Sequence, residues 1–167
     1  MEKLVFRHAV PDDAEAIAML LHSIADDLSV TLLDHDFPLG VSREVIENLS
    51  PKTAIIIAEK MESPGIVGCL MLESYSGHIH PFDHVSTIAM YIDREFYDKG
   101  IDKQLLDEGF KAAIEAGFEK IYTFLRVDNI RAIRFFVNNG FRIVGTIHNF
   151  AKKDNIYIDG IIIESFI

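Results

Sequence analysis

The part of the sequence that most constrains the fold runs from residue 85 to residue 125, because it predicts a strand, a long helix and another strand. Val85 to Ile92 is rich in β-branched and apolar residues, and Ile121 to Leu125 has the same character. Between them, Asp102 to Ala116 has the spacing of an amphipathic helix and ends at Gly117. Its apolar face is expected to carry Leu105, Leu106, Phe110, Ala113 and Ile114. A strand-helix-strand unit crosses over in the right-handed sense, so the two strands should lie parallel in one sheet.

The chain before this unit predicts a strand and two helices. Leu4 to His8 has strand character, and Pro11-Asp12-Asp13 is a helix-start signal. The helix that follows repeats apolar residues at three- and four-residue steps: Ile17, Leu20, Leu21, Ile24 and Leu28. A shorter helix from Ser42 to Leu49, capped by the serine, is expected to turn Val45 and Ile46 inward.

The other elements complete an α+β chain. They are expected as a hairpin of Thr53–Glu59 and Ile66–Tyr75, a helix at Asn129–Asn138 closed by Gly140, and strands at Phe141–His148 and Ile156–Phe166. With no linker or internal repeat, residues 1–167 are expected to form one domain. Its fold is a mixed, mostly antiparallel central sheet of about seven strands flanked by about four helices.

The composition narrows the class of protein and of partner. A formal net charge of -10 disfavours a nucleic-acid partner and would attract a cationic substrate, although acidic proteins also gain solubility from such a charge. No apolar run approaches the ~20 residues of a membrane span. The N-terminus lacks an apolar run of signal-peptide length, and Cys69 is the single cysteine. We therefore expect a cytoplasmic protein with a buried, inert Cys69 and no membrane partner.

A phosphate site is one expectation for the loop that precedes the central helix. Gly100 leads directly into the helix, whose first amides and positive dipole end suit an anion. Lys99 and Lys103 add positive charge. A helix with an ordinary cap has the same appearance, so the residues of this loop leave both interpretations open.

The motifs around this loop, taken together, resemble the GNAT superfamily of N-acetyltransferases. They are the strand ending in Met90-Tyr91-Ile92, the loop at Gly100, the helix and strand that follow, Asn129-Ile130-Arg131-Ala132, and Gly140-Phe141. The resemblance covers nearly the whole chain. It implies the acyl-CoA N-acyltransferase fold and transfer of an acetyl group from acetyl-CoA to a primary amine of a small molecule or peptide, by direct attack in a ternary complex.

The resemblance also implies where coenzyme A would bind. The pyrophosphate would lie on backbone amides of the loop, the pantetheine would run beside the end of the fourth strand, Asn129 would bond that arm, and Arg131 would meet a phosphate. The implied coenzyme-binding residues are Met90, Tyr91, Ile92, Tyr97, Asp98, Lys99, Gly100, Ile101, Asp102, Lys103, Asn129 and Arg131.

Three positions depart from the pattern of the family. Tyr97 stands where Arg or Gln is usual, Asp102 where Gly or Ala is usual, and Phe136 where a tyrosine often protonates the departing thiolate. A carboxylate close to a phosphate is repulsive. The alternative function is therefore a GNAT-like binding or regulatory module with weak or absent acyl-CoA binding.

The residue that removes a proton from the amine is the least determined part of the site. Val85 to Ile92 contains no glutamate, which family members often use there, so the candidates are Glu73 and His84. Each has a solvated-loop explanation as well. The cluster His78, His80, Asp83 and His84 lacks a rigid ligand spacing, so no metal is expected.

Two surfaces are expected from the order of elements. The acceptor groove should lie between loops at Val30–Leu39 and Ser76–His84. The last strand should form an edge of the sheet, where a second copy could pair to give a homodimer.

Overall fold

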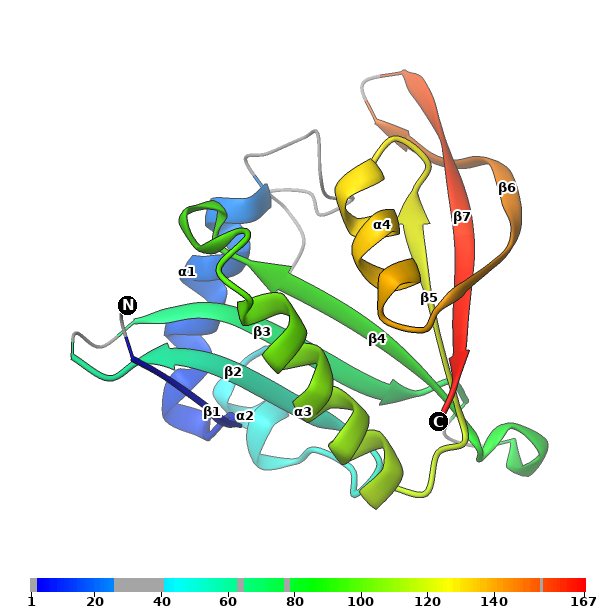
Figure 1. The fold of residues 1–167 in the computed structure, drawn as a ribbon. Coiled ribbons are helices and arrows are strands. Elements are labelled where there is room, and N and C mark those ends of the chain that lie inside the picture. Colours follow the sequence, from blue (N-terminus) through cyan, green and yellow to red (C-terminus); the bar gives the residue numbers. More distant parts are fainter. Residues whose placement is uncertain (1–2, 26–40, 63–64, 77–78, 154) are drawn as a thin grey trace.

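The computed structural model describes residues 3–25, 41–62, 65–76, 79–153 and 155–167, and Figure 1 shows their arrangement. Within these residues seven strands form one mixed sheet in the order β1-β2-β3-β4-β5-β7-β6. The strands are β1 (Leu4–His8), β2 (Ala54–Lys60), β3 (Ile66–Ser74), β4 (Val85–Ile92), β5 (Lys120–Arg126), β6 (Arg142–Lys153) and β7 (Ile156–Phe166). The expected class and sheet are confirmed.

The helices of the described residues lie on the two faces of this sheet (Figure 1). They are α1 (Ala14–Ala25), α2 (Arg43–Glu47), α3 (Ile101–Glu115) and α4 (Ile130–Asn138), with short 3-10 turns η1 (Pro11–Asp13), η2 (His80–Phe82) and η3 (Arg94–Phe96). None of these helices has both the length and the apolar character needed to cross a bilayer.

Each face of the sheet has its own apolar core. On one face, α3 and α4 cover a cluster that includes Leu70, Leu105, Leu106 and Phe136. On the other face, α1 and α2 cover a smaller cluster that contains Ile17 and Cys69. Successive side chains of a strand point to opposite faces, so β2, β3 and β4 supply residues to both cores.

Local rules place the ends of the helices. Ser42 caps α2 by accepting a hydrogen bond from the Val45 amide at 3.2 Å, as expected from its residue type. Gly100 precedes α3 with a φ of 76°, a left-handed conformation that suits glycine. Cys69 is fully buried, as expected, and burial raises the pKa of its thiol to about 12, which disfavours the thiolate.

Two expectations about buried side chains are wrong. Val45 is 41% exposed while Ile46 is buried: the two residues are about 100° apart around α2, and Ile46 is the one that packs in the core. Ile114 is 61% exposed, because the buried stripe of α3 is centred on Leu105 and Gly109 and Ile114 points away from it. Leu28 lies outside the described residues.

The edge of the sheet also differs from the expectation. β7 lies between β5 and β6 with antiparallel partners on both sides, so the last strand is not an edge strand. The outer position belongs to β6, whose pairing with β7 is interrupted at Ile143/Gly145 and at Ile147/Ala151. Such irregularities increase local twist and make an edge less suitable for further pairing.

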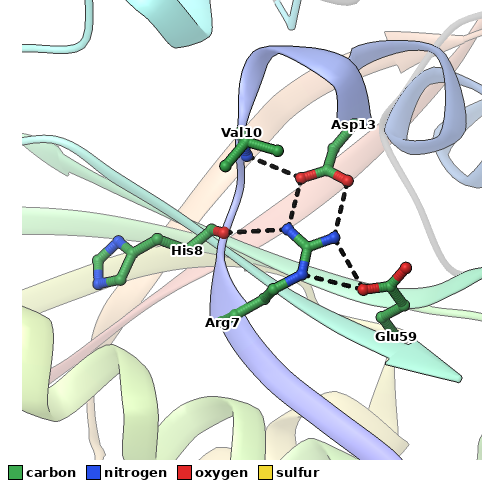
Figure 2. A network of polar contacts seen from close by, with 5 residues as sticks. All are labelled: Arg7, His8, Val10, Asp13 and Glu59. Atoms are coloured by element: carbon green, nitrogen blue, oxygen red, sulfur yellow. Dashed lines mark hydrogen bonds and ion pairs between the residues drawn. The ribbon is translucent and has the colours of Figure 1, made fainter. Parts of the chain in front are cut away.

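A network of polar contacts joins β1 to the start of α1 (Figure 2). The Arg7 guanidinium donates to both Asp13 oxygens at 2.7 and 2.9 Å and to Glu59 at 2.9 Å. Asp13 also accepts the Val10 amide at 2.7 Å. The hydrogen bonds from Arg7 hold the pKa of the Asp13 carboxyl below its usual value of 3.8. This network fixes the angle at which α1 leaves β1.

We expect Asp13→Asn to lower the free energy of unfolding by about 1 to 3 kcal/mol at neutral pH, because Arg7 loses its charged partner. Since the folded pKa of Asp13 is depressed, its stabilising effect is complete above the unfolded pKa and disappears as the pH falls through the folded value. The difference between wild type and variant should therefore shrink below about pH 4. Urea unfolding at several pH values measures it.

The control is Asp12→Asn. The Asp12 side chain is 76% exposed and pairs with the exposed Arg43, so its removal should change stability by less than about 0.5 kcal/mol. Equal losses in the two variants would contradict the role given to Arg7.

Candidate functional site

The central feature of the site is the separation of β4 from β5. The two strands are parallel, as predicted, but they pair only at Val85↔Lys120, Ser86↔Ile121 and Thr87↔Tyr122. Beyond Thr87 they diverge toward their carboxyl ends, and α4 lies beside the gap (Figure 1). Within the described residues, the backbone groups of residues 88–92 that face β5 therefore have no partner strand.

A cavity of 380 Å³ lies between the diverging strands. Its walls come from β4, β5, α4, the end of α1 and the loop before α3. The lining residues are Ile24, Ile88, Ala89, Met90, Tyr91, Ile92, Tyr97, Asp102, Thr123, Phe124, Leu125, Arg126, Asn129, Arg131, Ala132, Phe135 and Phe136. We call it the coenzyme-side cavity, after the residues for which a coenzyme role was predicted.

The structure brings seven of the twelve predicted coenzyme residues to this cavity: Met90, Tyr91, Ile92, Tyr97, Asp102, Asn129 and Arg131. The others, Asp98, Lys99, Gly100, Ile101 and Lys103, form the adjoining loop and the first turn of α3. Their roles stay predictions.

The loop before α3 has the backbone geometry of an anion site. Asp98 and Gly100 both have positive φ, at 59° and 76°, and alternation of this kind turns successive amides to one side. As far as the structure describes the chain, no protein acceptor bonds the amides of residues 98–102. These amides are available to an anion at the positive end of α3.

Arg131 bridges this loop and α4. Its guanidinium lies over the Tyr97 ring, with the carbon atom 3.6 Å from the ring centroid. One of its nitrogen atoms is 3.5 Å from an oxygen of Asp102 and 3.9 Å from one of Asp98. Tyr97, at a position where the family usually has Arg or Gln, thus holds an arginine supplied by α4.

The Asp102 carboxylate lies among the groups that are predicted to meet an anion. Its Oδ1 atom accepts the Lys103 amide at 2.9 Å, and its Oδ2 atom faces Arg131. A carboxylate in this place compensates the helix dipole and also competes with an incoming anion for the same groups. It does not point away from the site.

The two lysines of the loop are engaged elsewhere. The Lys103 ammonium forms an ion pair with Asp107 one turn further along α3, and both are exposed. The Lys99 ammonium lies 4.5 Å from the centre of the Phe96 ring. The positive charge that lines the cavity comes instead from Arg126 and Arg131.

Arg126 is a lining residue that the sequence analysis missed. It is the last residue of β5, and its guanidinium bonds both oxygens of Asp128 at 2.8 and 2.6 Å. Its side chain is 10% exposed. A signal was present, because a charged residue at the carboxyl end of a parallel strand often belongs to a site.

Asn129 and Phe136 organise α4. The Asn129 side chain caps the helix by accepting the Ala132 amide at 3.1 Å, and it lines the cavity. Phe136 is 4% exposed and packs edge-to-face on Phe141, with centroids 5.0 Å apart. At the position where the family often has a tyrosine, the wall of the cavity is apolar.

A second cavity, of 270 Å³, lies on the face of the sheet covered by α1 and α2. Its lining residues are Leu21, Val41, Val45, Leu49, Thr53, Ile55, Met71, Glu73, Thr87, Ile88, Ala89 and Tyr91. Ile88, Ala89 and Tyr91 line both cavities, so β4 is their common wall. We call it the acceptor-side cavity, because it adjoins the coenzyme-side cavity through β4.

The two candidate bases lie in different places. Glu73 is exposed, lines the acceptor-side cavity and is paired in register with Thr87. His84 is exposed, precedes β4 at the end where β4 and β5 are still paired, and lines neither cavity. The described part of the predicted acceptor loop at residues 76–84 lines neither cavity, and residues 30–39 lie outside the described chain.

The histidine cluster has a simple geometry where it is described. His80 bonds Asp83 at 3.2 Å, and both are exposed. His78 lies outside the described residues. In the ranges that the structure describes, no three His, Cys, Asp or Glu side chains gather as metal ligands would.

A comparison of the chain with models of protein families identifies its family. A family model described as an acetyltransferase (GNAT) domain matches residues 42–162, which is well over half of the chain. The chain belongs to the GNAT acetyltransferase family. No curated protein is significantly similar to this GNAT chain in sequence.

Solved GNAT structures share this fold at low sequence identity. A GNAT acetyltransferase from Streptococcus pneumoniae has a TM-score of 0.87 at 19% identity, over 99% of this chain and 100% of the other. The ribosomal-protein-alanine N-acetyltransferase from Brucella melitensis has a TM-score of 0.82 at 21% identity, over 98% and 99%. A phosphinothricin acetyltransferase from Sinorhizobium meliloti, in complex with acetyl-CoA, has a TM-score of 0.82 at 18% identity, over 98% and 88%.

We expect inorganic pyrophosphate to bind the loop before α3 and to shift the NMR resonances of amides 98–102, which have no protein acceptor. Arg131→Met should weaken this binding by about three- to tenfold, because the guanidinium beside the loop is removed while the backbone amides remain. Arg134→Met is the matched control, since Arg134 is exposed on the same helix and lines neither cavity. Equal weakening in both variants would show a general charge effect only.

Proposed function

We propose that this GNAT protein transfers an acetyl group from acetyl-CoA to a primary amine. The observation that carries the proposal is the pair of cavities that meet at the unpaired edge of β4, one lined by two arginines and the other by a glutamate. The complex of the Sinorhizobium meliloti relative with acetyl-CoA supports acetyl-CoA as the donor.

The donor would lie along the coenzyme-side cavity. The amides of residues 98–102 and the Arg131 guanidinium suit a diphosphate. The pantetheine arm is a chain of amides, and the edge of β4 from Met90 to Ile92 offers it hydrogen bonds of the kind a strand would make. Arg126 lines the same cavity at the end of β5.

The reaction would take place where the two cavities adjoin. Acetyl-CoA supplies a thioester whose carbonyl carbon is attacked by the amine. Unpaired amides of β4 would stabilise the negative charge that develops on the carbonyl oxygen. Holding donor and amine on the two sides of one strand supplies orientation, which is a large part of the acceleration.

Proton transfer would involve the acceptor side. Glu73 is the proposed acceptor of the proton from the amine, directly or through a water, because its carboxylate lines that cavity. His84 is not used, since it lines neither cavity. With Phe136 in the apolar wall, the departing thiolate would take its proton from water. The single, buried Cys69 is compatible with a reducing, cytoplasmic setting for this chemistry.

The proposal is tested by thermal unfolding with acetyl-CoA. At a hundred times its dissociation constant the donor adds about 2.7 kcal/mol to stability, which should raise Tm by about 5 to 10 °C. Sodium sulfate at the same ionic strength is the control for salt. Absence of a shift at about 1 mM acetyl-CoA would favour the alternative, a GNAT-like binding or regulatory module.

We expect Asp102→Asn to tighten acetyl-CoA binding by about two- to tenfold, because the negative charge that pairs with Arg131 and repels the diphosphate is removed. Asp107→Asn, in the same helix but paired with Lys103 outside the cavity, should leave the dissociation constant almost unchanged. Calorimetry measures both. Unchanged or weaker binding in Asp102→Asn would exclude this effect of the charge.

A further inference from the structure

We propose that the acceptor is a small primary amine with an apolar body and no acidic group, bound in the acceptor-side cavity with its ammonium group at Glu73. This inference rests on the proposed acetyltransferase function and specifies the substrate of that site. Three properties of the cavity carry it: its charge, its apolar walls and its unpartnered polar groups.

The charge in the acceptor-side cavity is of one sign. Among the described residues that line it, Glu73 is charged and no lysine, arginine or histidine is present. The coenzyme-side cavity, by contrast, is lined by Arg126 and Arg131 together with Asp102. Among the described lining residues, an acceptor that carries a carboxylate would meet no cation, and it would be repelled by Glu73.

The walls of the cavity are mainly apolar. Eight of the twelve described residues that line it are aliphatic or methionine: Leu21, Val41, Val45, Leu49, Ile55, Met71, Ile88 and Ala89. Four of them, Leu21, Val41, Ile55 and Ile88, are buried. The volume of 270 Å³ is slightly below the roughly 300 to 1,000 Å³ of typical small-molecule sites. These dimensions suit a compact hydrocarbon body.

The polar groups of the cavity are those that an ammonium group needs. Within the described chain, no hydrogen bond or ion pair is made by the side chains of Glu73, Thr87 or Tyr91, whereas the Thr53 hydroxyl is bonded to Ser50 at 2.8 Å. Glu73 and Thr87 are directly opposite each other in the β3–β4 register, so both side chains lie on the face of the sheet that borders the acceptor-side cavity. An ammonium group has three donors and no acceptor, which matches the side-chain oxygens of Glu73 and Thr87.

Tyr91 adds no charge to the acceptor-side cavity. Its ring packs in the core beneath α1, and it lines both cavities. Burial raises the pKa of its phenol to about 12, and the negative charge of Glu73 contributes in the same direction. The phenol therefore stays neutral, and the carboxylate is left as the charge that an acceptor meets.

The test compares two acceptors that differ by one carboxylate, 2-phenylethylamine and phenylalanine. With acetyl-CoA as donor, kcat/KM for the amine should exceed that for the amino acid by at least about tenfold, because the carboxylate would be placed near Glu73 without a cation. The release of free coenzyme A thiol measures both rates. A ratio near one, or in favour of phenylalanine, would overturn the inference.

Glu73→Gln should reduce this ratio by at least about threefold, because the repulsion of the carboxylate is removed with the charge. If Glu73 also accepts the proton, both rates fall together and the ratio still reports the charge effect. If turnover is then too slow, the dissociation constants of the two compounds in the presence of coenzyme A give the same ratio. Glu62→Gln, in the connection between β2 and β3 and outside both cavities, is the matched control and should keep the wild-type ratio.

The outcomes separate this inference from the proposed function. If acetyl-CoA binds but phenylalanine is acetylated as well as the amine, the acetyltransferase proposal stands and the acceptor class is wrong. If acetyl-CoA gives no thermal shift and neither compound is acetylated, the proposed function fails, and the inference fails with it. A wild-type ratio that Glu73→Gln leaves unchanged would assign the selectivity to a residue other than Glu73.

Discussion

The limited pairing of β4 with β5 is the constraint on which the rest of the site depends. Two parallel strands joined at three residue pairs and then separated leave backbone groups without a partner inside an otherwise continuous sheet. Unpaired backbone groups away from water are costly, so a gap of this kind is stable where α4 flanks it and where a ligand or water can enter it. The gap also places β4 between two cavities, one on each side, which allows two ligands to meet across a single strand.

Charge separates the two sides of β4. Arg126 and Arg131 line the coenzyme-side cavity, and Glu73 lines the other, although the chain as a whole is strongly acidic. Arg131 is held by weak interactions. It stacks on the ring of Tyr97, faces the Asp102 carboxylate and is partly exposed to solvent. Ion pairs between partly exposed side chains contribute little to stability, so Arg131 can exchange its protein partners for an anion at small cost in free energy. The same argument explains how an aspartate is tolerated at the start of α3.

Much of the fold could be predicted from local patterns. The bounds of β1 and β4, the cap at Ser42 and the loop-to-helix junction at Gly100 follow from residue types over a few positions. The predictions that failed concern geometry between elements. Ile114 was placed on the buried face by its apolar character, although its direction around α3 points away from the sheet. The edge position of β6 could not be predicted, because strand order depends on which distant segments pair.

For this protein the sequence by itself determined the order of elements, the parallel unit between residues 85 and 125, and the family pattern, because short-range periodicity, turn chemistry and motif spacing are properties of neighbouring residues. Only the tertiary structure decided the partners of side chains far apart in the chain. It placed Arg131 over Tyr97, brought the unpredicted Arg126 into the coenzyme-side cavity, and put Glu73 but not His84 in the wall of the acceptor-side cavity. These outcomes depend on strand register and on the angle between diverging strands, which are set by packing over the whole sheet.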